Sequence, residues 1–310
     1  MTGKPRHLVS VADLTDDEMG WVLERAASLK TTRRSHARPL TGRALALIFE
    51  KPSLRTRLSF DVAMQDLGGT ASYLSPAEVG LGRRESVADV ARVVSRLVDA
   101  AVLRTNAHET IEEFARYSTI PVLNGLSDVE HPCQAVADLV TMREHKGDLR
   151  GVVAAFVGDG NNVAHSLMLA AAMTGLTLRV ASPEGYEPGR AWRAEVDERA
   201  KRTSARITVG NDPVEAVRGA DVVYTDVWTS MGQEAEYERR RRAFKGFQLN
   251  AALLAHAAPD AVVMHDLPAH RGEEITDDVL DGARSVVFDQ AENRLHAQKA
   301  LLCWALEGGS

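Results

Sequence analysis

The sequence predicts an α/β protein built from two tandem domains, each a mainly parallel sheet flanked by helices. Two observations carry this prediction. Short apolar segments of strand length alternate with helical patterns from residue 43 to about residue 124, and the alternation restarts at residue 152. Such alternation is typical of βαβ units. The length of 310 residues suits two domains with sizeable cores.

In the first half, residues 1–40 read as mainly helical, and we place the boundary of the first domain near Gly147, after a long helical pattern that begins at His131. The predicted strands are residues 45–49, 71–74, 100–104 and 121–124, with helices at 86–96 and 110–117 between them.

In the second half, a buried strand at 152–157 is followed by a helix at 163–173. Further strands are predicted at 176–181, 206–208, 222–225 and 261–264, and a last helix at 291–306. The charged segment 234–245 reads as an exposed loop or helix, and we interpret the basic run 239–242 within it as solvated surface.

Composition excludes several classes of protein. Apolar residues make up 45% and charged residues 26%, which is ordinary for a soluble globular protein, and the net charge of -6 provides no basic field for nucleic acid. We find no secretory signal and no apolar run of membrane-spanning length. Cys133 and Cys303 fit no disulfide framework or metal-ligand spacing, so we expect a reducing, cytoplasmic location.

The most informative stretch is the turn at residues 53–57. Pro52 stops the preceding strand, and Ser53 is suited to cap the next helix. The free N–H groups and dipole of a helix N-terminus favour an anion there. A pair of arginines on a helix is usually solvated, but in this strand–turn–helix context we expect a phosphate-type ligand. The turn supplies two hydroxyls and two guanidinium groups, from Ser53, Thr56, Arg55 and Arg57.

Other polar residues follow predicted strands or open helices, where ligands of open α/β sheets bind. Arg104 ends one strand, and His131 and Gln134 open a helix, although such a histidine is more often a structural cap. The segment 158–163 differs from a dinucleotide fingerprint because Val163 replaces its third glycine. The remaining candidates for holding an amino acid or its reacting group are Asn161, Asn162, Asp226, Ser230, Asp266 and Arg294.

Five motifs occur in order along the chain: Ser53-x-Arg55-Thr56-Arg57, His131-Pro132-x-Gln134, Gly158-Asp159-Gly160-Asn161-Asn162, Asp226-x-Trp228-x-Ser230-Met231-Gly232 and Leu267-Pro268-Ala269-His270-Arg271-Gly272-Glu273. Together they resemble the aspartate/ornithine carbamoyltransferase family, and the Ser-Met-Gly loop resembles its ornithine branch. The resemblance covers essentially the whole chain.

The resemblance implies a carbamoyl-phosphate domain at 1–147, an amino-acid domain at 148–288, and a C-terminal helix at 289–310 that packs back on the first domain. It also implies a cytoplasmic homotrimer with shared active sites, a role in arginine biosynthesis, and no metal or organic cofactor. The substrates are carbamoyl phosphate and an amino-acid amine, most simply ornithine, which becomes citrulline. The implied catalytic residues are Arg104, His131, Asp266 and Arg294. The implied substrate-binding residues are Ser53, Leu54, Arg55, Thr56, Arg57, Gly80, Arg84, Gln134, Asn162, Asp226, Ser230, Met231 and Leu267.

Two departures from the family pattern leave the acceptor amine open. Asp266 stands where ornithine enzymes usually have a cysteine beside the reacting amine. Gly80 stands where they usually have a glutamine that reaches a neighbouring subunit's phosphate, so Arg83 or Arg84 is expected to serve instead. The alternatives are another diamino acid (diaminopropionate, diaminobutyrate or lysine) or a weakened paralogue that binds or regulates. The sequence leaves open the direction of the pathway, higher oligomers and regulation.

Overall fold

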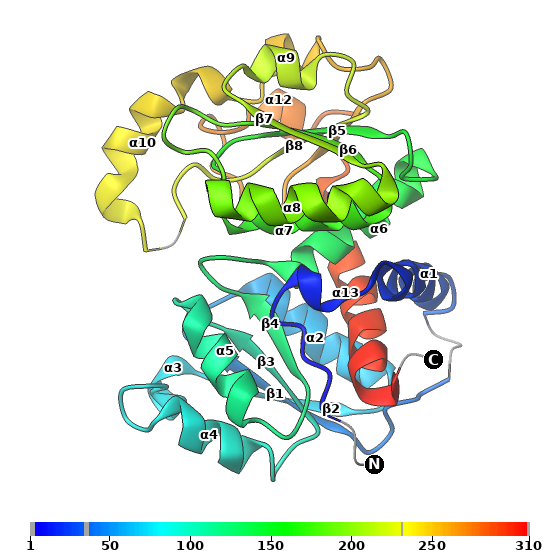
Figure 1. Ribbon diagram of the computed structural model, residues 1–310, viewed down its shortest axis with the longest axis vertical. Helices are drawn as coiled ribbons and strands as arrows, with labels where there is room; N and C mark the ends of the chain where they lie inside the picture. The colour runs from blue at the N-terminus through cyan, green and yellow to red at the C-terminus, as the bar shows by residue number, and fades with distance from the viewer. Residues whose placement is uncertain (1–3, 34–36, 231, 309–310) are drawn as a thin grey trace. The chain divides into compact units, whose positions relative to one another are not determined.

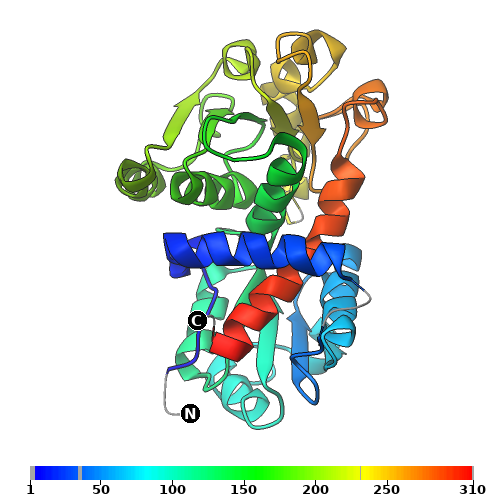
Figure 2. The same ribbon diagram turned by 90° about the vertical axis from the view of Figure 1, so that its right-hand side faces the viewer.

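The computed structural model describes residues 4–33, 37–230 and 232–308. The chain divides into two compact units, which we call unit 1 (Met1–Val140 and Asn293–Ser310) and unit 2 (Thr141–Glu292). Each unit contains one parallel sheet flanked by helices, and the predicted fold class is thereby confirmed (Figures 1 and 2). Both unit boundaries fall inside helices, namely α6 (Pro132–Lys146) and α13 (Val287–Cys303).

The sheet of unit 1 has four strands in the order β2-β1-β3-β4. They are β1 (Ala44–Phe49), β2 (Thr70–Leu74), β3 (Ala100–Arg104) and β4 (Val122–Leu126). Because β1 and β3 are neighbours in parallel register, Phe49 pairs with Arg104. The residues after both strands therefore meet at one edge of the sheet, which is where ligands bind in open α/β sheets.

Helices cover both faces of this sheet. On one face, Ala46 and Ile48 of β1 form a core cluster with apolar residues of α4 (Val87–Val94) and α5 (His108–Tyr117). Figures 1 and 2 show α2 (Leu54–Asp66) and α13 on the other face. The remaining helical segments of the unit are η1 (Val11–Asp13), α1 (Asp16–Thr31), α3 (Pro76–Val79) and η4 (Trp304–Gly308).

The sheet of unit 2 has five strands in the order β7-β6-β5-β8-β9. They are β5 (Val153–Val157), β6 (Thr177–Ala181), β7 (Arg206–Gly210), β8 (Val222–Thr225) and β9 (Val262–Met264). Central β5 and its neighbour β8 place Gly158 and Asp226 one residue past the strand ends. A side chain at residue 160 would be blocked, because a Cβ there would lie 2.3 Å from the backbone nitrogen of Pro188.

In Figure 1, α7 (Asn162–Thr174) and α8 (Arg190–Thr203) lie on one face of the second sheet, with α9 (Pro213–Val217) and α12 (Asp277–Leu280) on the other. The sequence analysis assigned no helix to α8, whose sequence is charged around most of its circumference and so lacks a clear apolar period. The other segments are η2 (Glu234–Glu236), α10 (Tyr237–Ala243), η3 (Lys245–Phe247) and α11 (Ala251–Leu254).

Two further features bear on the sequence analysis. Cys133 and Cys303 are free and buried, and burial raises the pKa of each thiol to about 12. Among the described helices, none has the length and apolar character needed to cross a membrane.

Candidate active site

The predicted anion turn is a capped helix N-terminus. Ser53 is the N-cap of α2, and its Oγ accepts a hydrogen bond from the N–H of Thr56 at 3.2 Å. The same hydroxyl donates to Thr56 Oγ1 at 3.1 Å. The predicted helix start is therefore confirmed, and it follows β1, whose last residue pairs with Arg104 of β3.

The side chains of this turn have different surroundings. The Arg57 guanidinium stacks on the ring of Tyr73, with 3.9 Å between its carbon and the ring centroid. The side chain of Thr56 is buried, whereas that of Leu54 is 76% exposed. Thr56 is thus the member of the turn that faces inward.

A buried histidine sits among three arginines at this edge of unit 1. His131, Arg104 and Arg294 are all at most 9% exposed. Burial, and then the charges of Arg294, Arg104 and Arg55 in that order, hold the pKa of His131 well below its ordinary value. The ring is therefore neutral at physiological pH, and a neutral imidazole can donate a hydrogen bond to a developing oxyanion.

Hydrogen bonds tie α2, α6 and α13 together around this histidine. Arg294 donates through Nη1 to Gln134 Oε1 at 2.8 Å and through Nη2 to Thr56 Oγ1. The amide nitrogen of Gln134 donates in turn to Asp138 Oδ1 at 2.8 Å. The sequence analysis did not identify Asp138, although its spacing of four residues from Gln134 on one helix would have pointed to it.

The loop at residues 80–86 lies within unit 1 as a tight turn. Gly80 has φ 58°, a left-handed conformation that favours glycine, and a Cβ there would lie 2.8 Å from the Cβ of Arg84. The exposed side chain of Arg84 donates through Nη1 to the carbonyl of Glu78 at 3.1 Å. Arg84 is therefore available at the surface.

In unit 2, Asp226 directly follows the end of β8. It is 5% exposed and accepts hydrogen bonds from the N–H of Val227 at 2.7 Å and from Asn161 Nδ2 at 3.2 Å. Asn161 is also the N-cap of α7, where its Oδ1 accepts from the N–H of Val163. Asn162, assigned from the sequence to the acceptor, is buried beside Asn161.

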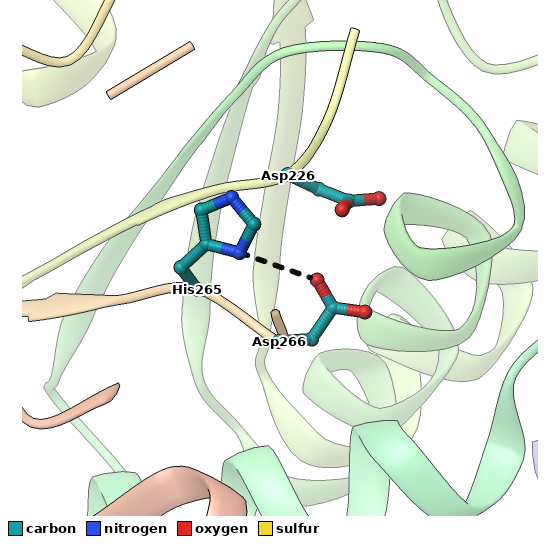
Figure 3. Close-up of side chains that lie close together, drawn as sticks. All are labelled: Asp226, His265 and Asp266. Carbon is teal, nitrogen blue, oxygen red and sulfur yellow. Dashed lines mark ion pairs between the residues drawn. The ribbon is translucent and has the colours of Figure 1, made fainter. Parts of the chain in front are cut away.

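Asp266 lies beside Asp226, as Figure 3 shows. Burial, and then the charge and hydrogen bond of Asp266, raise the pKa of Asp226 well above its ordinary value. Two carboxylates in one buried site do not both ionise readily, because each charge opposes the other. This pair therefore offers a strongly attractive site for a cation.

The neighbouring His265 is held by hydrogen bonds within unit 2. Its Nε2 lies 3.0 Å from Glu274 Oε1, and its Nδ1 accepts from the N–H of Leu267 at 2.9 Å. These partners assign the proton to Nε2. Nδ1 also lies 3.6 Å from Asp266 Oδ1, the contact dashed in Figure 3. A metal ion would therefore find two carboxylates here, but no available imidazole nitrogen.

The loop that follows β9 has a strained backbone. Leu267 has φ 57°, unusual for a residue other than glycine, and precedes a cis peptide bond to Pro268. Of the other predicted acceptor-binding residues, Ser230 donates its N–H to Gln233 Oε1 at 3.1 Å, and Met231 lies outside the described residues.

One interpretation from the sequence was wrong. Arg240, within the basic run assigned to solvated surface, is 6% exposed. Its Nη1 donates to Asp159 Oδ2 at 2.7 Å and to the carbonyl of Trp228 at 3.0 Å. Burial raises the pKa of Asp159 to about 6, against the lowering effect of Arg240. The pair ties α10 to the loop after β5, and no local pattern distinguishes Arg240 from its exposed neighbours.

The two clusters, cationic in unit 1 and acidic in unit 2, define an α/β enzyme suited to an anionic substrate and a cationic one. Residues 6–144 match the carbamoyl-phosphate-binding domain of the aspartate/ornithine carbamoyltransferases, and residues 150–305 match their aspartate/ornithine-binding domain. The chain belongs to the aspartate/ornithine carbamoyltransferase family.

Relatives within the family include ornithine carbamoyltransferases. The chain is 55% identical over 299 residues to that of Archaeoglobus fulgidus, covering 96% of both chains. It is 57% identical over 303 residues to that of Acidothermus cellulolyticus, covering 97% of both. The structure of the enzyme from Pyrococcus furiosus aligns with a TM-score of 0.95 at 51% identity, covering 99% of each chain.

Proposed function

We propose that this enzyme transfers the carbamoyl group of carbamoyl phosphate to the side-chain amine of ornithine, giving citrulline and phosphate. The observation that carries the proposal is the neutral His131 enclosed by Arg294, Arg104 and Arg55. This arrangement suits an acyl phosphate whose carbonyl oxygen develops negative charge. The identity of 51–57% to ornithine carbamoyltransferases supports the same reaction.

The phosphate is assigned to the N-terminal turn of α2. Ser53, Thr56 and the backbone N–H groups supply hydrogen bonds, and Arg55 and Arg57 supply charge-assisted contacts that strengthen as the phosphate departs. Leu54 contributes its backbone to the same turn. We therefore assign residues 1–147 as the carbamoyl-phosphate domain, which residues 289–310 complete.

The carbamoyl oxygen is assigned to Arg104, His131 and Thr56. The neutral amine attacks the carbonyl carbon, a C–N bond forms, and the carbonyl oxygen becomes an oxyanion that these donors stabilise. The C–O bond to phosphate then breaks, phosphate leaves with the electron pair, and the nitrogen gives up one proton. Arg294 and Gln134 hold the rest of the carbamoyl group.

The acceptor is assigned to unit 2, within residues 148–288. The carboxylate of Asp226 suits the α-ammonium group, while Asn162, Ser230 and Met231 serve the α-carboxylate and Leu267 supplies its backbone. Asp266 is assigned to the side-chain amine. A carboxylate there both attracts the ammonium form and provides an acceptor for its proton.

The acidic pair also favours a second candidate, the carbamoylation of a shorter diamino acid. A carboxylate is bulkier than the thiol usual at position 266, which leaves less room for ornithine's amine.

The decisive experiment is turnover of carbamoyl phosphate with ornithine, lysine, diaminobutyrate and diaminopropionate, followed by colorimetric detection of the ureido product. We expect the highest kcat/KM with ornithine. A higher value with diaminobutyrate selects the second candidate, and absence of turnover with every amine rejects both.

We further propose a cytoplasmic homotrimer that works in arginine biosynthesis. The relative from Pyrococcus furiosus at 52% identity is named an anabolic ornithine carbamoyltransferase. Exposed Leu54 and Leu58 on α2, at 76% and 56%, suit burial against another subunit. Exposed Arg84, with the turn that Gly80 permits, suits contact with a neighbour's phosphate.

Mixing two inactive variants tests this assembly. Arg84→Ala chains retain Arg55, and Arg55→Ala chains retain Arg84, so about a quarter of the sites in randomly mixed trimers contain neither lesion. We expect partial recovery of activity after the chains are unfolded and refolded together, with separately refolded chains as the control. An active monomer by sedimentation, or no recovery in a mixture that forms trimers, contradicts shared sites.

A further inference from the structure

Gln134 and Asp138 form a buried pair on α6. They are four residues apart, so their side chains project from the same face of the helix. Gln134 Nε2 donates to Asp138 Oδ1 at 2.8 Å, and the two residues are 1% and 0% exposed. The hydrogen bond is therefore protected from water.

The partners of Gln134 determine which way its amide points. A guanidinium only donates hydrogen bonds. Arg294 Nη1, 2.8 Å from Oε1, therefore requires the oxygen end of the amide, and the NH2 end is left to donate to Asp138 Oδ1. A flipped amide would turn its NH2 group toward the guanidinium, which is also a donor, and it would lose the bond to Arg294.

This orientation gives the amide oxygen a chemical role. An amide oxygen has two lone pairs, and Arg294 takes one of them. The second suits an N–H donor, such as the amino group of a carbamoyl substrate. Acetyl phosphate has a methyl group in place of that amino group and is otherwise similar in shape and charge.

We propose that Asp138 is a positioning residue that fixes the Gln134 oxygen toward the substrate's amino group and so makes the enzyme select carbamoyl phosphate over acetyl phosphate. The inference rests on the proposed function, in which Gln134 holds the carbamoyl group. It adds a residue that acts through Gln134 and assigns it a role in selecting the acyl group.

The test is the binding of each phosphate to Asp138→Asn. Asparagine has nearly the same shape, but it can present either its oxygen or its NH2 group to Gln134, so only Arg294 still favours one orientation of the amide and the oxygen is held less firmly. We expect carbamoyl phosphate to bind about tenfold more weakly, the cost of one hydrogen bond. Acetyl phosphate and inorganic phosphate should change less than twofold, measured by calorimetric titration at low temperature.

A double-mutant cycle separates positioning from a general structural effect. In a Gln134→Met background there is no amide to orient, so adding Asp138→Asn should leave the ratio of the two acyl phosphate affinities unchanged. Asp89→Asn, an exposed carboxylate on α4, is the matched control and should alter neither affinity. Asp138→Ser provides the same comparison if the asparagine variant does not fold.

Two outcomes overturn the inference: an unchanged ratio of the two acyl phosphate affinities in Asp138→Asn, or a change in this ratio that is equally large in the Gln134→Met background. Either can occur while the wild type still makes citrulline, in which case the proposed function stands and only the role of Asp138 fails. A wild type that turns over no amine defeats the proposed function itself, which is a different result in a separate assay.

Discussion

The strand-end sites of the two units share a backbone plan and differ in charge. In unit 1, Ser53 caps the helix after β1, and the arginines around His131 make the site cationic. In unit 2, Asn161 caps the helix after β5, and Asp226 and Asp266 make the site acidic. A parallel sheet therefore provides the position of a binding site, while a few side chains determine whether the site binds an anion or a cation.

The largest effect should come from removing charge in the cationic site. Arg55→Ala is expected to lower kcat/KM by about a hundredfold or more, because the departing phosphate loses a charge-assisted contact. Initial rates at saturating amine measure this. Arg96→Ala, an exposed arginine on the same unit, is the control. Normal turnover in a folded Arg55→Ala protein would remove the basis for the phosphate site.

The matching change in the acidic site is Asp226→Asn. We expect KM for ornithine to rise about 30-fold, the effect of losing about 2 kcal/mol from a charge-assisted hydrogen bond. Binding of carbamoyl phosphate should change little, since its assigned contacts lie in unit 1. Separate titrations of the two substrates measure this. Equal weakening of both substrates would contradict the division of labour between the units.

A third effect concerns stability rather than binding. The pKa of Asp159 in the folded protein is about 6, above its ordinary 3.8, so between these values the folded state holds the proton more tightly than the unfolded state. The free energy of unfolding therefore falls as pH rises. Relative to Asp159→Asn, the wild type should lose about 2 kcal/mol between pH 4.5 and 7.5.

Urea unfolding of both proteins across this pH range measures the difference. The asparagine variant also leaves Arg240 without its charged partner, but this loss is the same at both pH values and cancels in the comparison. Parallel pH profiles for the two proteins would show that burial does not dominate the titration of Asp159.

The smallest predicted effect is a change in the preferred acceptor amine when one of the two carboxylates of the acidic site is replaced. Asp266→Cys replaces the second carboxylate with the thiol usual in ornithine enzymes. We expect the kcat/KM of ornithine, relative to that of diaminobutyrate, to rise about tenfold, as the reacting amine gains room and loses a competing charge. If the ranking of amines is the same in both proteins, position 266 does not select the acceptor.

Local signals in the sequence predicted the fold well. The Pro52-Ser53 boundary is correct because a strand stop and a helix cap are properties of neighbouring residues. The proximity of Arg294 to Thr56 and Gln134 is different, since it depends on α13 returning to unit 1. Only the family resemblance pointed to it.

Residues that support the sites were harder to predict. Arg240 is buried while the other three arginines of the run Arg239 to Arg242 are exposed, and nothing in the local sequence separates them. Its burial follows from Asp159, which is 81 residues away in the chain. The pairing of Gln134 with Asp138 was visible as a spacing of four, but polar pairs at that spacing are common on solvated helices.

The two buried cysteines give this chain an experimental advantage. The reactive form of cysteine is the thiolate, and Cys133 and Cys303, the chain's two cysteines, have pKa values of about 12. The folded wild type should therefore be nearly inert toward maleimide dyes. In Asp266→Cys, a dye or spin label would attach at one position only. The native protein is thus a ready-made background for placing a single spectroscopic reporter where the acceptor amine is proposed to react.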